Sequence, residues 1–190
     1  MPAQGLRVAS ADRHVSQQPA SLLQRAAAFG LDYLLISAYL IILVIVGLLV
    51  QFASPALSHA LFGSAITGEL TGFAVLTLPV TLYFTFGEAS AARATWGKHR
   101  LGLRVVTGDD QRLGLGRSLL RSGLKFLPWE LAHASIWQFM FAGPKPPLLD
   151  AALAVVWLLV GLNVLSVLVD GRHRALYDRI ARTMVISAGR

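Results

Sequence analysis

The chain has 190 residues, of which 55% are hydrophobic and 14% charged, whereas a soluble domain carries about 25% charged residues. This composition favours a membrane protein, and the length allows one membrane domain. The 17 Lys and Arg against ten Asp and Glu give a net charge of +7. In a membrane protein the positive-inside rule explains this excess better than nucleic-acid binding does. The absence of cysteine excludes disulfides, thiol nucleophiles and Cys-based metal sites.

The N-terminal residues 1–20 are polar and show no periodicity. We expect a flexible cytoplasmic tail there, a transmembrane domain over 21–186 and a short C-terminal end at 187–190. Ser21 is a candidate N-cap for the first helix.

The first apolar run covers residues 26–50, and about 20 such residues cross a bilayer core. Arg25 stands at its start and Asp32 inside it, seven residues later, so both lie on nearly one helical face, roughly 10 Å apart along the axis. An ionisable residue at membrane depth is costly unless it is paired or faces water, so Asp32 is a candidate functional residue.

Three further runs predict helices over about 70–89, 118–142 and 148–169. Pro79 should kink the second helix, with hydroxyls of Thr77 and Thr81 satisfying the freed carbonyls. Glu88 is interpreted as a charge at the end of that helix. Polar residues interrupt the segment 118–142, which is therefore compatible with a spanning, re-entrant or interfacial helix.

Between the second and third runs the chain is basic and alternates apolar and polar residues around the turn-forming sequence TGDDQR. This pattern predicts a short cytoplasmic β-hairpin-like insert, suited to an anionic membrane surface. The expected fold is thus an all-α membrane protein with about four transmembrane helices and this insert.

The distribution of basic residues favours four crossings. Three fall in 1–25, none in 51–92, eight in 93–125, one at Lys145 and five in 172–190. With four crossings, sixteen of the seventeen lie inside and both termini are cytoplasmic; with three, the basic C-terminal segment would lie outside, against the positive-inside rule.

Three separated stretches resemble the RDD family of integral membrane proteins. LLQRAAAFGLDYLL is similar to the start of the family's first helix, with Arg25 and Asp32 at the matching places. ATWGKHRLGLRVV resembles the T-x-G-K-x-x-x-G-L-x-V-V region, and RALYDRIART resembles the closing R-x-L-x-D-x-x-A-x-T, which places the second aspartate at Asp178. Tyr177 departs from the glycine expected before this aspartate. The resemblance implies a multi-pass protein of a bacterial inner membrane and suggests transport or ion exchange.

Four residues form the candidate binding site. Asn163 lies seven residues before the end of the last helix, so it should reach the depth of Asp32 and could hydrogen-bond to it or share a cation with hydroxyls of Ser37, Thr81 or Thr85. Asp178 should lie near the cytoplasmic surface beside Arg25, which predicts an Arg25–Asp178 ion pair. The alternatives without a binding function are that Arg25 anchors the helix at the membrane interface and that Asp32 pairs with an arginine for helix packing.

These observations are compatible with two functions of different classes. The first is transport or exchange of a small cation, proton or solute around Asp32, by a homo-oligomer because four helices enclose little space. The second is a non-transporting accessory or scaffold protein whose basic surface binds anionic lipid headgroups or a membrane protein. No catalytic signature, cofactor motif or metal site is recognisable, and Glu130 with His133 lacks an identifiable third ligand.

Overall fold

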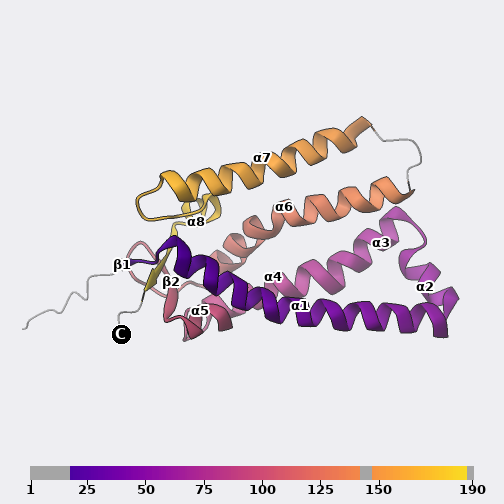
Figure 1. Ribbon diagram of the computed structural model, residues 1–190, viewed down its shortest axis with the longest axis horizontal. Coiled ribbons are helices and arrows are strands. Elements are labelled where there is room, and N and C mark those ends of the chain that lie inside the picture. Colours follow the sequence, from indigo (N-terminus) through magenta and orange to yellow (C-terminus); the bar gives the residue numbers. More distant parts are fainter. Residues whose placement is uncertain (1–17, 142–146, 188–190) are drawn as a thin grey trace, which may run out of the picture.

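The computed structural model describes residues 18–141 and 147–187 (Figure 1). The helices run roughly along the long axis, and a small sheet with two short helices occupies one end of the molecule. Most of the expected tail, the last three residues and Lys145 lie outside the described residues.

The first helix, α1 (Leu22–Ala53), begins with a capping box in which the Gln24 amide donates to Ser21 Oγ at 3.2 Å. Most of its apolar side chains are exposed, which suits a lipid environment. A short helix, α2 (Pro55–Phe62), follows it.

The second long helix is continuous over Ala65–Ala89. It consists of α3 (Ala65–Gly72), a π-helical turn (Phe73–Thr77) and α4 (Leu78–Ala89). The π turn directly precedes Pro79.

The carbonyl that Pro79 leaves without its usual partner is satisfied differently from the sequence-based expectation. The hydroxyl of Tyr39 donates to the carbonyl of Val75, four residues before the proline. Thr77 Oγ1 is buried and forms no hydrogen bond with any residue that the structure describes. The expected Thr77 contribution is therefore wrong, because α1 supplies the donor.

The basic segment does not form a closed hairpin. After α5 (Trp96–Arg100), strand β2 (Leu103–Thr107) pairs antiparallel with β3 (Thr183–Ser187) from the end of the chain. β3 also pairs with β1 (Gln18–Pro19), giving the order β1-β3-β2. The expected second hairpin strand is instead coil and the start of α6, since the C-terminal segment occupies the edge of β2.

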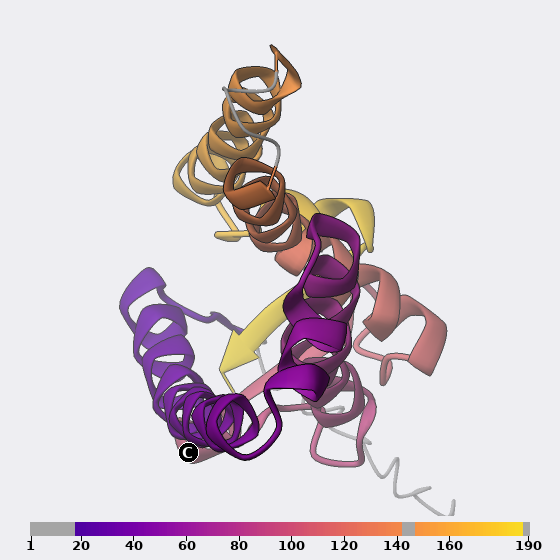
Figure 2. The ribbon, with the colours of Figure 1, turned by 90° about the vertical axis from the view of Figure 1, so that its right-hand side faces the viewer.

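The remaining helices are α6 (Leu115–Phe141), α7 (Pro147–Val169) and α8 (Leu176–Ile180). α6 packs against α3, α4 and α7, whereas α1 packs mainly on α5 and α2. Figure 2 shows α1 and α7 on separate arms of the molecule. Both described chain ends meet at the sheet.

Three described helices are long and apolar enough to cross a membrane: α1, the continuous α3–α4 helix and most of α7. α6 is as long as these but carries several charged residues. The mainly helical membrane character expected from the sequence is confirmed.

Candidate functional site

Asp32 lies on α1 with 0% of its surface exposed and accepts three hydrogen bonds. Its Oδ1 accepts from the Tyr83 hydroxyl and the Gly97 amide, both at 2.7 Å, and its Oδ2 accepts from Thr95 Oγ1 at 2.6 Å. No arginine or lysine forms a salt bridge with Asp32 in the part of the chain that the structure describes. Asp32 therefore attaches α1 to α4 and to the start of α5 through hydrogen bonds.

Gly97 is required by this close approach. A Cβ atom at Gly97 would lie 2.2 Å from the carbonyl oxygen of Ala28 and 2.9 Å from Cγ of Asp32, both closer than van der Waals contact allows. The glycine in the TWGK sequence thus lets α5 lie against α1.

A second carboxylate, Asp178, is the centre of a buried ion network. Its Oδ2 lies 2.6 Å from Arg25 Nη2 and its Oδ1 lies 2.8 Å from Arg121 Nη2, so the predicted Arg25–Asp178 ion pair is present. Arg121 also pairs with Glu88, whose Oε1 lies 3.0 Å from Lys98 Nζ. The network joins α1, α4, α5, α6 and α8.

The surroundings of Asp178 favour its ionised form. Burial alone would raise the pKa of this carboxyl, but the neighbouring Arg121 and Arg25 lower it below the ordinary value. The amide of Ala175 and the hydroxyl of Thr183 also donate to it, at 3.3 and 3.2 Å. Asp178 thus fixes the C-terminal segment against the helices.

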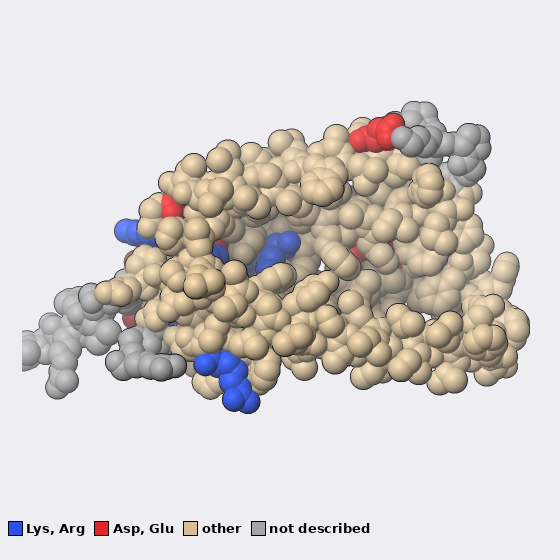
Figure 3. All heavy atoms as spheres, in the orientation of Figure 1, with Lys and Arg blue, Asp and Glu red and all other residues tan. Residues whose placement is uncertain are grey.

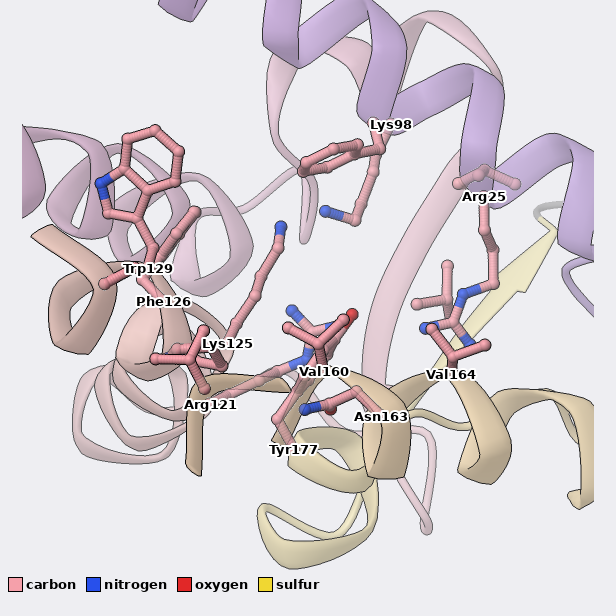
Figure 4. Close-up of a pocket in the computed structure, with 16 residues that line it drawn as sticks. Arg25, Lys98, Arg121, Lys125, Phe126, Trp129, Val160, Asn163, Val164 and Tyr177 are labelled. Carbon is pink, nitrogen blue, oxygen red and sulfur yellow. The ribbon is translucent and has the colours of Figure 1, made fainter. Parts of the chain in front are cut away.

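Beside the network lies a cavity of about 600 Å³ (Figure 4). Among the residues that the structure describes, four cationic side chains and no carboxylate line it: Arg25, Lys98, Arg121 and Lys125. Its other walls are mostly apolar, formed by Phe29, Leu103, Phe126, Pro128, Trp129, Ala132, Val156, Val160, Val164 and Val185, with Asn163 and Tyr177. Figure 3 shows basic side chains in a hollow between α1 and α7.

Lys125 differs from the other three cations. Its Nζ lies 3.4 Å from the centre of the Phe84 ring and 5.0 and 5.1 Å from those of Phe29 and Phe126. These are cation–π contacts, and within the described residues no carboxylate forms a salt bridge with Lys125. In Figure 4 its side chain extends into the cavity toward Lys98.

A comparison with the profiles of known protein families shows to which family the chain belongs. The profile of the RDD family matches residues 19–182. The chain belongs to this family. No curated protein and no solved structure matches it.

In this RDD protein the residues that carried the resemblance form two separate centres. Asp32, with Thr95 and Gly97, forms the hydrogen-bonded centre between α1 and α5, while Arg25 and Asp178 belong to the ion network. The arginine and the first aspartate therefore do not pair with each other, although they share a helix face.

Asn163 lies in the wall of the cavity rather than beside Asp32. Its Nδ2 donates to the carbonyl of Leu159 at 2.9 Å, and its Oδ1 is buried without a hydrogen-bond partner among the described residues. Asp32 does not line the cavity. The expected Asp32–Asn163 hydrogen bond is not formed, because the donors of Asp32 come from α4 and α5 instead.

The hydroxyls expected to share a cation with Asp32 also do not reach it. Thr85 Oγ1 donates to the carbonyl of Thr81 at 2.8 Å, within one helix. Neither Thr81 nor Ser37 forms a hydrogen bond with Asp32 among the described residues.

Sequence reasoning missed the inner part of the network. Glu88 does stand near a helix end, as expected, but it is 0% exposed and pairs with Lys98 and Arg121. A signal existed: Arg121 lies four residues before Lys125 in an apolar helix, and cations at membrane depth require acidic partners.

A third polar group joins Glu130 and His133 from α3. The carboxyl of Glu69 lies close to that of Glu130, and Nε2 of His133 accepts from Trp137 Nε1 at 3.3 Å. In the described chain no group of three such side chains has the geometry of a metal site.

Proposed function

We propose that this RDD family protein binds an anionic amphiphile, such as an acidic phospholipid, in the cavity between α1, α6 and α7. The proposal extends the accessory-protein alternative, in which anionic lipid headgroups are the partner. We further propose that it crosses a bacterial cytoplasmic membrane four times, with both termini in the cytoplasm.

The four-crossing arrangement is supported by the length and position of α6. Its 27 residues extend about 40 Å, which exceeds a hydrocarbon core of about 30 Å. It lies between α4 and α7, and its charged residues Arg121 and Lys125 point to the network and the cavity. The chain ends also meet at one end of the molecule, as an even number of crossings requires.

The balance between the cations that line the cavity and their carboxylate partners is the observation that supports an anionic ligand. Within the described residues, two carboxylates, Glu88 and Asp178, pair with the four lining cations, Arg25, Lys98, Arg121 and Lys125. A surplus of buried positive charge is costly, and an anion in the cavity would neutralise it.

The apolar walls select an amphiphile over a simple anion. Phe29 and Trp129 line the cavity yet are 45% and 47% exposed, so the cavity opens sideways at the level of the apolar helices. α1 packs mainly on α5 and α2, and α7 mainly on α6 and α8, which leaves a lateral opening between α1 and α7. An acyl chain could lie there with its headgroup near Lys125.

The test compares lipid retention by Lys125→Met and by Arg104→Met, an exposed residue of β2 outside the cavity. Native mass spectrometry of the purified protein would measure binding of phosphatidylglycerol and phosphatidylcholine. A charge-assisted contact is worth roughly 1.5–3 kcal/mol, so Lys125→Met should bind phosphatidylglycerol roughly 10- to 100-fold more weakly. Arg104→Met should bind like the wild type.

Loss of the fold would not explain such a result. Lys125 has no salt-bridge partner within the described residues, and a methionine can keep contact with the aromatic rings around it, so Lys125→Met should unfold near the wild-type temperature. If Lys125→Met kept the wild-type preference for phosphatidylglycerol, the proposal would be wrong.

Passage of a small cation or proton at Asp32 is the second candidate. One observation favours it: this buried carboxylate has no cationic partner in the described chain. Its three hydrogen-bond donors and its complete burial argue for a structural role. Ion flux into proteoliposomes distinguishes the two: Asp32→Asn should abolish flux if Asp32 carries the ion, whereas Asp109→Asn, in the exposed turn after β2, should not.

A further inference from the structure

A second, smaller pocket lies at the end of the molecule that holds the sheet. Its volume is about 280 Å³, and it is separate from the cavity between the helices. Five arginines and one carboxylate line it: Arg117, Arg172, Arg174, Arg179, Arg182 and Asp109. They come from the start of α6, the loop after α7, α8 and the residues around it, and the turn after β2.

Four of the five arginines have guanidinium groups without a partner in the part of the chain that the structure describes. Arg174 makes a bidentate pair with Asp170, through Nε at 3.1 Å and Nη2 at 3.0 Å. The side chains of the other four form no hydrogen bond or salt bridge within the described residues. Like charges gathered in one concave surface repel each other, and an anion placed among them would relieve this repulsion.

The backbone around the pocket is held in an uncommon conformation. His173, between two of the arginines, and Arg182 both have a φ of 53°, in the left-handed region that side chains other than glycine rarely adopt. Two hydrogen bonds fix the first of these turns: the amides of Arg172 and Arg174 donate to Asp170 at 3.2 and 3.0 Å. Such conformations gather at ligand-binding sites.

The lining also indicates the kind of anion. Of the described residues that line the pocket, Met184 alone has an apolar side chain, so they offer no wall for an acyl chain. Guanidinium groups bind phosphate oxygens through paired N–H donors. Four free arginines exceed what one phosphate needs. We propose that this arginine pocket binds a small soluble anion with two or more phosphate groups, independently of the amphiphile in the cavity.

The positive-inside rule alone does not explain the arrangement. That rule requires basic residues near the helix ends on the cytoplasmic side, and separate positions around the protein would satisfy it. Here arginines from three parts of the chain converge on one concavity instead.

The experiment is a calorimetric titration of the full chain with inorganic pyrophosphate, in zwitterionic detergent. The test variant is Arg179→Gln/Arg182→Gln, which removes two guanidinium groups that have no partner among the described residues. The matched control is Arg104→Gln, an exposed arginine outside the pocket. Pyrophosphate should bind wild type and control equally, and the double variant at least about tenfold more weakly, which corresponds to about 1.4 kcal/mol.

A second titration in nanodiscs with phosphatidylglycerol distinguishes a soluble ligand from a lipid headgroup. Binding that persists there supports the soluble anion; competition by the lipid would assign the pocket to a headgroup and overturn the soluble ligand. Absence of binding to the wild type, or equal binding by the double variant and the control, would refute the site itself.

Discussion

Removing Arg121 should be the most damaging single change in the ion network. Its side chain is 2% exposed and pairs with both Glu88 and Asp178, with Nη2 2.8 Å from Asp178 Oδ1. Arg121→Met leaves these two buried carboxylates with one fewer cation. Breaking a buried pair costs about 3–5 kcal/mol, which for a chain of this length lowers the Tm by roughly 6–20 °C.

The assay is thermal unfolding of the purified protein in detergent, followed by the fluorescence of its four tryptophans. The control is Arg174→Met, which breaks the more exposed pair with Asp170 and should cost at most about 1 kcal/mol. Arg121→Lys should lie between the two, because one ammonium cannot hold both carboxylates as the guanidinium fork does.

A compensating change sharpens the test. Arg121→Met/Glu88→Gln removes one of the two uncompensated carboxylates and should recover part of the lost stability. If Arg121→Met unfolded at the same temperature as Arg174→Met, the network would not stabilise the fold as argued.

Three further predictions concern other buried groups. Gly97→Ala should lower the unfolding free energy by about 1–3 kcal/mol, since the new Cβ would meet the Ala28 carbonyl at 2.2 Å; Gly116→Ala, with nothing within 4 Å, should not. The folded-state pKa of Asp178 lies below its ordinary value of 3.8, so its stabilisation is complete above about that pH and is lost as the pH falls through the folded-state pKa. Thermal unfolding of wild type and Asp178→Asn across that range should therefore converge in acid, and a constant difference would contradict this. Glu130→Gln should unfold near the wild-type temperature at neutral pH, because the amide removes the repulsion between the neighbouring carboxyl groups of Glu130 and Glu69; a loss of several degrees would contradict it.

The helices were predictable because each is a local pattern. The apolar run at 26–50 and the Ser21 cap indicate a helix without knowledge of any other segment, and α1 extends it by only a few residues at each end. The prediction of a hairpin was wrong because strand pairing is not a local property. β2 carries the right alternation, but its partner β3 stands about 80 residues later, and alternation does not identify the partner.

The same limit applies to the candidate site. The Arg25–Asp178 pair could be predicted because both residues were expected at one membrane surface. The partners of Asp32 could not, since Tyr83, Thr95 and Gly97 stand 51, 63 and 65 residues later in the chain and no local pattern brings them to it.

Counting the basic residues of each segment predicts on which side of the membrane the segment lies, but it treats all basic residues alike. The structure separates those that pair with carboxylates from those that do not. Arg25 and Arg121 form ion pairs with buried carboxylates, so substitution of either arginine should lower the stability of the fold. Lys125 and the four arginines of the pocket have no carboxylate partner among the described residues, and a cation without such a partner costs desolvation or repulsion. A substitution of these residues that leaves the Tm unchanged and weakens anion binding would therefore identify charge retained for a ligand.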